Sequence, residues 1–217
     1  VNFEHMSSNI IVANNVCYGA QTFVLATNWR NSLITGNLAS NIRCAVYTGS
    51  WDRLTVSNNN FYFIMSKTFD GVYDRGVYTN ATDSNSVHGN VSVKNNIFEK
   101  SLSHCIALSG TICTVENNII RSPNMAGIYV SYAANFSSII GNTITDEVSD
   151  TYYGIYVNPL AGTSPVSYVA NNVTEKMNCT GVASSTEKSV IAYNLIKKSA
   201  TIASTFTNVG NIIAGTV

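Results

Sequence analysis

The sequence contains little charge. Only 11% of its 217 residues are Asp, Glu, Lys or Arg, and 12 acidic residues balance 12 basic ones, so the formal net charge is zero. A neutral chain lacks the basic patch that binds nucleic acid or an anionic membrane. No apolar run approaches the roughly 20 residues that span a bilayer, and the first residues lack the basic start and apolar segment of a signal peptide. We therefore predict neither nucleic-acid binding nor membrane insertion.

Paired cysteines and metal-ligand spacings are also missing. The five cysteines are odd in number and form no CxxC motif, whereas secreted disulfide frameworks usually hold an even number at close spacing. We predict reduced and mostly buried thiols, and folding in a reducing cytoplasm. The three histidines show no ligand spacing, and no P-loop or GxSxG motif is present. We predict no metal site and no cofactor.

Proline is scarce and helical periodicity is absent, which argues against a helical bundle or a βαβ fold. What recurs instead is an asparagine motif, seen in VKNNIFEK at 93–100 and VENNIIRS at 115–122. Several successive copies are 22 residues apart, and longer gaps mark inserted loops. The second asparagine of the motif, or its equivalent, recurs at Asn15, Asn37, Asn59, Asn96, Asn118, Asn142, Asn172, Asn194 and Asn211.

A second recurrent strand lies between these motifs, for example AGIYVS at 126–131 and YGIYVN at 153–158. Each unit is thus two or three short strands of alternating pattern. A unit of about 22 residues cannot bury its apolar face alone, but stacked units bury a continuous column. The sequence predicts an all-β solenoid: a single-stranded right-handed parallel β-helix of about nine rungs, roughly 22 residues per rung. We expect one domain over 1–217. Because Val1 opens in the middle of a repeat, we expect a fragment of a longer chain.

The asparagines have a structural explanation in such a coil. Asparagine tolerates the left-handed region that a sharp turn between strands requires, and Gly36 and Gly141 directly precede the motif asparagine in two copies. Stacked about 4.8 Å apart, equivalent asparagine side chains can form a hydrogen-bonded ladder. We therefore interpret the asparagines as structural.

These repeats, over roughly residues 10–213, resemble those of the right-handed parallel β-helix family, the pectin-lyase-like solenoids. That family includes pectate and pectin lyases, polygalacturonases, bacteriophage tailspikes, capsule depolymerases and some adhesins. The low charge, the many asparagines and the free thiols look most like a phage tailspike. The resemblance implies a homotrimer, a virion-tail location with action at the host cell surface, and a bacterial surface polysaccharide (O-antigen or capsule) as partner.

Outward-facing aromatic residues are the first candidates for substrate binding. If Ile128 and Val130 point inward, Tyr78, Tyr129 and Tyr156 share an outward row with Val46 and Ala107. This row is a sugar-stacking platform, a subunit interface or a set of cross-rung aromatic pairs. Trp29 and Trp51, each eight residues before a ladder asparagine, form either a second stacking surface or a stack packed under a loop.

The longest connection, residues 63–76, brings Asp70, Tyr73, Asp74 and Arg75, and long insertions on a rigid scaffold often carry function. By alignment, Arg75 shares a row with Arg43 and His104. A neighbouring row is predicted to contain Glu99, Arg121, Asp146, Glu175 and Lys197.

Glycoside hydrolysis needs two carboxyl groups about 5–9.5 Å apart, which adjacent rungs supply. Asp74 and Glu99, with Asp70 nearby, are the preferred catalytic group, and Asp146 with Glu175 is the runner-up pair. Arg43, Arg75 or Arg121 would bind an acidic sugar. The charged row also fits a solvated salt-bridge ladder.

The sequence therefore favours a tailspike body that binds and hydrolyses surface polysaccharide. The alternatives are a non-catalytic structural or receptor-binding segment of a tail fibre or adhesin, and a polysaccharide lyase.

Overall fold

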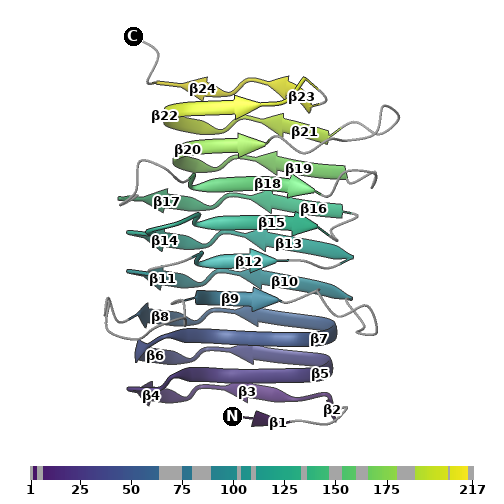
Figure 1. Ribbon diagram of the computed structural model, residues 1–217, viewed down its shortest axis with the longest axis vertical. Helices are drawn as coiled ribbons and strands as arrows, with labels where there is room; N and C mark the ends of the chain where they lie inside the picture. The colour runs from purple at the N-terminus through teal and green to yellow at the C-terminus, as the bar shows by residue number, and fades with distance from the viewer. Residues whose placement is uncertain are drawn as a thin grey trace.

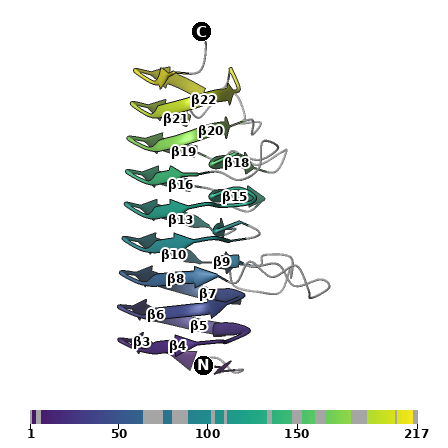
Figure 2. The same cartoon turned by 90° about the vertical axis from the view of Figure 1, so that its left-hand side faces the viewer.

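The computed structural model describes residues 2–3, 7–63, 75–79, 89–101, 104–108, 111–132, 136–146, 153–159, 166–179, 189–204 and 206–214. All regular structure in these ranges is β-strand, and every strand pair is parallel (Figure 1). The strands stack one above another from the N-terminal to the C-terminal end of the chain (Figure 2). The predicted all-β, right-handed parallel β-helix is confirmed. No helix in the described ranges offers an apolar segment long enough to cross a membrane.

Three faces run the height of the helix. Face 1 contains the strands that precede the ladder asparagines: β3 (Ile11–Ala13), the ends of β5 (Thr22–Thr35) and β7 (Cys44–Ser57), β10 (Asn90–Lys94), β13 (Ile112–Glu116), β16 (Phe136–Ile140), β19 (Val166–Ala170), β21 (Ser189–Ala192) and β23 (Phe206–Val209). Face 2 follows the asparagines: β4 (Val16–Tyr18), β6 (Leu38–Ile42), β8 (Asn60–Phe63), β11 (Ile97–Glu99), β14 (Ile119–Arg121), β17 (Thr143–Thr145), the starts of β20 (Val173–Cys179) and β22 (Leu195–Ile202), and β24 (Ile212–Ile213).

Face 3 closes each turn: β1 (Asn2–Phe3), the starts of β5 and β7, β9 (Arg75–Thr79), β12 (Ile106–Leu108), β15 (Ile128–Tyr132), β18 (Ile155–Pro159), and the ends of β20 and β22. The short β2 (Ser7–Ser8) pairs with Trp29 and Arg30, where β5 bends from face 3 to face 1.

The core is a column of inward side chains, because alternate residues of a strand point to opposite faces. On face 1, Val56, Val93, Val115 and Ile139 stack in register and are fully buried. On face 2, the rings of Phe61 and Phe98 stack with centroids 5.5 Å apart. No single unit could bury this apolar surface, and therefore the stack is the unit of stability.

The cysteines agree with the sequence prediction. All five are free thiols: Cys17 is half-buried, and Cys44, Cys105, Cys113 and Cys179 are buried. Burial disfavours the thiolate and raises the pKa of Cys105, Cys113 and Cys179 from 9.0 to about 12. These thiols therefore act as small apolar core residues.

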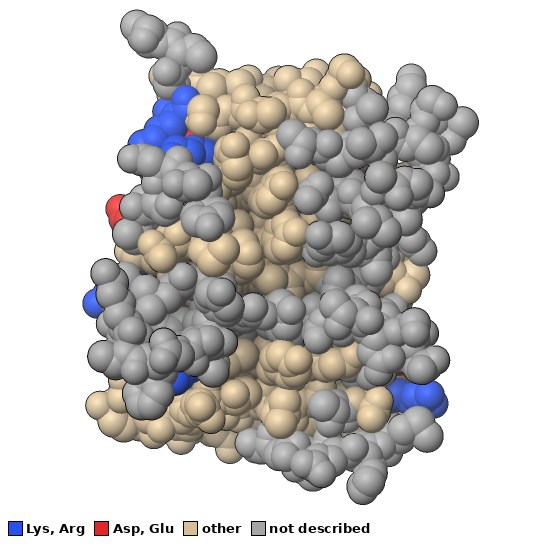
Figure 3. Space-filling view, in the orientation of Figure 1, with Lys and Arg blue, Asp and Glu red and all other residues tan. Residues whose placement is uncertain are grey.

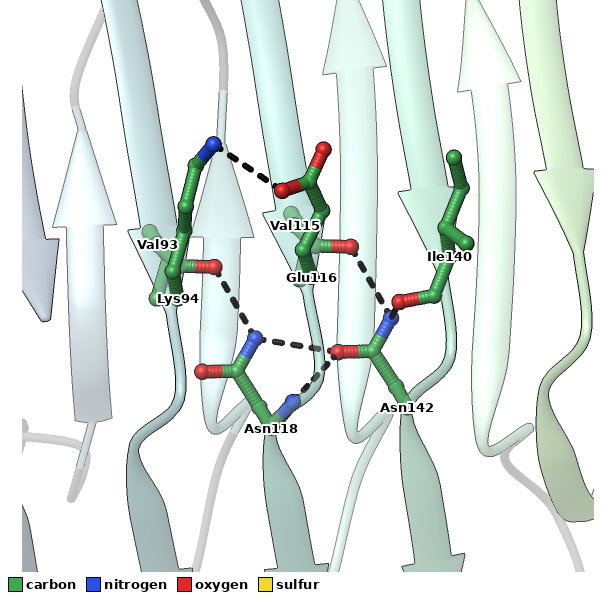
Figure 4. A network of polar contacts seen from close by, with 7 residues as sticks. All are labelled: Val93, Lys94, Val115, Glu116, Asn118, Ile140 and Asn142. Atoms are coloured by element: carbon green, nitrogen blue, oxygen red, sulfur yellow. Dashed lines mark hydrogen bonds and ion pairs between the residues drawn. The ribbon is translucent and has the colours of Figure 1, made fainter. Parts of the chain in front are cut away.

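The predicted asparagine ladder is present and runs through all nine asparagines. Asn118 is typical: its backbone N–H and its Nδ2 both donate to Oδ1 of Asn142, at 3.0 and 2.9 Å, and its Nδ2 also donates to the Val93 carbonyl at 2.9 Å (Figure 4). Its own Oδ1 accepts the equivalent pair from Asn96. Steps in the ladder span 22 residues in four cases and between 17 and 37 residues overall.

The turn itself is made by the preceding residue and not by the ladder asparagine. Asn58, Asn95 and Asn117 have φ values of 53 to 56°, and Gly36 and Gly141 have 65 and 68°. At Gly36 a Cβ atom would lie 2.5 Å from Oδ1 of Asn14. Glycine therefore avoids a close contact there, and it also adopts the left-handed backbone without steric strain. The double asparagine thus has two roles, turn first and ladder second.

Candidate functional site

The outward row of face 3 carries the aromatic candidates. Register pairs place Leu25, Tyr47, Tyr78, Ala107, Tyr129, Tyr156 and Asn178 in one row along the helix axis. As predicted, Ile128 and Val130 point inward and are buried, as are Ile155 and Val157.

The prediction that Val46 belongs to this row is wrong. Val46 is fully buried and pairs with Val24 and Val77, and its neighbour Tyr47 occupies the row. The error is a shift of one residue, which exchanges the two sides of a strand.

Tyr129 and Tyr156 of this row contact each other and the nearby rings of His104 and Tyr153. His104 and Tyr129 have centroids 4.9 Å apart with an interplanar angle of 25°, and Tyr129 and Tyr156 are 5.2 Å apart at 31°. Tyr153 joins Tyr156 at 5.9 Å and 45°. His104 is held by the Ala126 N–H, which donates to Nδ1 at 3.2 Å.

The His104–Tyr129 pair is stacked and the two tyrosine pairs are tilted, and all three separations lie in the range of favourable aromatic pairs. Of the three interpretations of this row, the ring distances support cross-rung aromatic pairing. Aromatic rings and phenolic hydroxyls are then what these side chains present outward.

Asn178 stands directly after Tyr156 in the row, and sequence reasoning did not select it. Its side chain is nine-tenths buried, and its Oδ1 accepts no hydrogen bond. A covered amide oxygen without a donor is costly. The sequence signal for it is its place in the repeat: in KMNC at 176–179, Asn178 stands where GIYV at 127–130 has Tyr129.

Charge is sparse along this face. In Figure 3 the tan atoms in the centre of the view belong to residues that are neither acidic nor basic, and the blue and red atoms lie toward the sides. Among the described outward side chains in the row, none is acidic or basic. The described part of this row can therefore contact a ligand through aromatic rings, hydroxyl groups and an amide, but not through charge; the half-buried Lys176 lies at the start of the face 3 part of β20.

The tryptophans do not form an exposed stacking surface, and that prediction is wrong. Trp29 is 0% exposed and Trp51 1%, and the two residues are register partners inside the corner between faces 3 and 1. Asn28 and Asn31 have φ values of 58 and 48°, so the strand alternation breaks on both sides of Trp29 and turns its ring inward. Their role is to fill the core at this corner.

The charged row lies on face 2 and is made of ion pairs. Glu99 and Arg121 are register partners, and Nη1 of Arg121 lies 2.5 Å from Oε1 of Glu99. Higher in the helix, Glu175 lies 3.3 Å from Nζ of Lys197 and 3.4 Å from Nζ of Lys198. Both glutamates are about 15% exposed, whereas their basic partners are 42–52% exposed. This arrangement fits the salt-bridge ladder that was one of the two interpretations.

Asp146 is not a member of this row, contrary to prediction. Thr145 is the register partner of Arg121, and Asp146 is the exposed turn residue that follows, with φ of 56°. Lys100 and Ser122 occupy the equivalent turn position, with φ of 63 and 52°. The runner-up pair of Asp146 and Glu175 is therefore not formed by neighbours in one row.

The insertion before β9 carries Asp74, one member of the preferred catalytic pair, together with Asp70 and Tyr73. Asp70, Tyr73 and Asp74 lie outside the described residues, and of Arg75 and Tyr78 only the backbone is described. The backbone of Arg75 pairs with Cys44, so the predicted alignment of Arg75 with Arg43 is wrong by one residue. Asp70 and Asp74 as catalytic residues, and Tyr73 and Arg75 as substrate-binding residues, stay predictions.

Among the described residues, no group of three or more His, Cys, Asp or Glu side chains is arranged to hold a metal ion. Like Glu99 and Glu175, Glu116 is paired with a base from a neighbouring rung: its Oε2 lies 2.9 Å from Nζ of Lys94 (Figure 4). Comparisons of this chain with protein-family models, with curated proteins and with solved structures found no match.

Proposed function

We propose that this chain is the β-helix body of a tailspike-type protein that binds a bacterial surface polysaccharide along face 3. The observation that carries the proposal is the group of contacting rings of His104, Tyr129, Tyr156 and Tyr153 on face 3, whose described outward row holds no acidic or basic side chain. Successive rungs repeat their hydrogen-bonding groups about every 4.8 Å. An extended polymer of sugars, with hydroxyl groups along its length, matches such a regular uncharged row.

Binding is better supported than hydrolysis. Of the predicted catalytic residues, Glu99 and Glu175 have their carboxylates in ion pairs with basic residues. A catalytic pair requires two facing carboxyl groups with separate protonation states. Cleavage by Asp74 with Glu99 is the second candidate function, and it rests on the long insertion before β9.

A homotrimer acting from a virion tail at the host cell surface belongs to the same proposal. Its support is an outward apolar row on face 2 that runs the height of the helix, interrupted by Asn60 and Thr143. Exposed members are Val16 (80%), Leu38 (41%), Ile119 (37%), Leu195 (38%) and Ile212 (63%). Contiguous apolar surface of this kind is typical of protein–protein contact.

The test is equilibrium binding to a panel of purified O-antigen and capsular polysaccharides. Its key variant is Tyr129→Phe with Tyr156→Phe, which removes both phenolic hydroxyls and keeps the contacting rings. Two lost hydrogen bonds at about 0.5–1.5 kcal/mol each predict binding weakened about 5- to 150-fold, with unchanged unfolding. Tyr168→Phe, on the outward side of face 1, is the matched control. If the wild-type chain binds nothing in the panel, or the double variant binds as tightly as the control, the proposal is wrong.

A further inference from the structure

One residue departs from the pattern of the turn between faces 1 and 2. The residue before each ladder asparagine has a left-handed backbone, and at eight positions it is asparagine or glycine: Asn14, Gly36, Asn58, Asn95, Asn117, Gly141, Asn171 and Gly210. The exception is Tyr193, with φ of 54°. A bulky side chain disfavours this region, and residues held in it often mark functional sites.

The side chain of Tyr193 is exposed despite its size. It is 62% exposed, far more than the paired tyrosines of face 3, which are half-buried. One side of its ring lies on the next rung at Gly210, where a Cβ atom would be 2.7 Å from both Cδ1 and Cε1 of the ring. Because residue 210 is glycine, the ring packs directly against the backbone there, and the rest of the ring is exposed.

The turn residue one rung before Tyr193 carries an uncharged amide. Asn171 holds the same turn position one rung before it and is exposed, and their rungs are joined by the Asn171 N–H, which donates to the Ala192 carbonyl at 3.1 Å. The same ridge carries exposed asparagines at 14, 58, 95 and 117. Side-chain amides both donate and accept, and therefore suit sugar hydroxyls in any orientation.

An exposed aromatic ring packed against backbone, beside the amide of Asn171, has the two parts that a sugar needs: a flat apolar surface for the C–H face and a polar group for the hydroxyls. Tyr193 has an open side, whereas Tyr129 and Tyr156 each contact two other rings. Asparagine and glycine occupy the other turns of this kind and adopt the left-handed backbone more readily, so the turn itself does not require tyrosine at 193.

We propose that Tyr193 is the stacking residue of a second carbohydrate-binding site, on the ridge between faces 1 and 2, which takes an uncharged sugar residue. The site rests on the proposed polysaccharide binding of this chain and extends it to a different ridge. The sugar lies against the open side of the Tyr193 ring, and the amide of Asn171 contacts its hydroxyls.

The test compares Tyr193→Asn, which introduces the residue found at most equivalent turns, with Tyr193→Phe and with the control Tyr168→Asn on face 1. The probes are neutral dextran and mannan, acidic polygalacturonate, and the polysaccharide panel named above. We expect Tyr193→Asn to weaken binding of a neutral probe about tenfold, with an equal or higher midpoint of thermal unfolding. Tyr193→Phe and Tyr168→Asn should bind within about twofold of wild type, since both retain the ring at 193.

Each outcome is decisive. If Tyr193→Asn binds like wild type while the face 3 double variant loses binding, the Tyr193 site is wrong and the proposed function stands. Wild-type binding to none of the probes overturns both. Preference of the Tyr193 site for polygalacturonate overturns its uncharged character. If Tyr193→Asn instead changes the sedimentation of the chain, the ring contacts a second copy, and the carbohydrate site is wrong.

Discussion

Asn118 offers a direct test of how the helix is held together. Its side chain is fully buried and makes four hydrogen bonds: two accepted from Asn96, one donated to Asn142 and one donated to Val93. Asn118→Ala leaves the backbone N–H of Asn96 and one of its Nδ2 hydrogens without an acceptor. A buried donor without a partner costs about 1–3 kcal/mol, so the expected loss is about 2–6 kcal/mol of unfolding free energy. This is a large share of the roughly 5–15 kcal/mol that stabilises a typical domain.

The matched control is the asparagine next to it. Asn117 is exposed and left-handed, with φ of 53°, and glycine occupies the same turn position at Gly36 and Gly141. Asn117→Gly should therefore change the unfolding free energy by less than about 0.5 kcal/mol. Urea unfolding followed by circular dichroism measures both values. A loss below about 1 kcal/mol in Asn118→Ala, or equal losses in the two variants, would refute the division between ladder and turn.

Two further predictions concern ionisable groups. The folded protein raises the pKa of Cys105, Cys113 and Cys179 from 9.0 to about 12, so the unfolded chain loses these protons first and stability falls as pH rises from about 9 toward 12. At pH 10 the three thiols together lower the unfolding free energy by about 4 kcal/mol relative to pH 7. Urea unfolding at the two pH values measures this loss. An equal decline in a variant with all three cysteines replaced by serine would contradict this origin. Glu99→Gln breaks the pair with Arg121, which is half-exposed, and should change the unfolding free energy by less than about 1 kcal/mol. If Glu99 is catalytic, the same variant abolishes polysaccharide cleavage with binding intact, as does Asp74→Asn; full cleavage by both would remove them as the catalytic pair.

The fold could be predicted because its determinants repeat. Each rung has the same turn and the same column to fill, so the spacing of Asn96 and Asn118 and the alternation around Ile128 carry the whole architecture. The asparagine ladder could be predicted because asparagine recurs at the spacing of the rungs, and identical side chains stacked in this way can hydrogen-bond to one another. Burial of the cysteines followed from their number and lack of spacing.

The site was harder to predict, since its residues vary between rungs and depend on a register accurate to one position. Val46 and Asp146 were each placed one residue away from the true row members Tyr47 and Thr145. A left-handed residue at Asp146 ends the strand alternation, and no sequence pattern announces it there.

Trp29 shows the same cause at a corner. Register shifts between Ala26 and Thr27, and between Thr27 and Trp29, interrupt the alternation on which the outward assignment depended. The repeats are aligned on the ladder asparagine, which in this turn is Asn194. Such an alignment does not single out Tyr193, the residue before it. Local irregularities in the coil therefore decide which side chains reach the surface.

The central claim is that an uncharged face 3 binds a polysaccharide. The most direct measurement is calorimetric titration of the wild-type chain and the Tyr129→Phe, Tyr156→Phe double variant with a panel polysaccharide, at low and at high salt. The account predicts an affinity that is nearly independent of salt, because the described side chains of the outward row carry no acidic or basic group. It also predicts that the affinity falls about 5- to 150-fold in the double variant. Binding that disappears at high salt, or that the two hydroxyls do not affect, would contradict it.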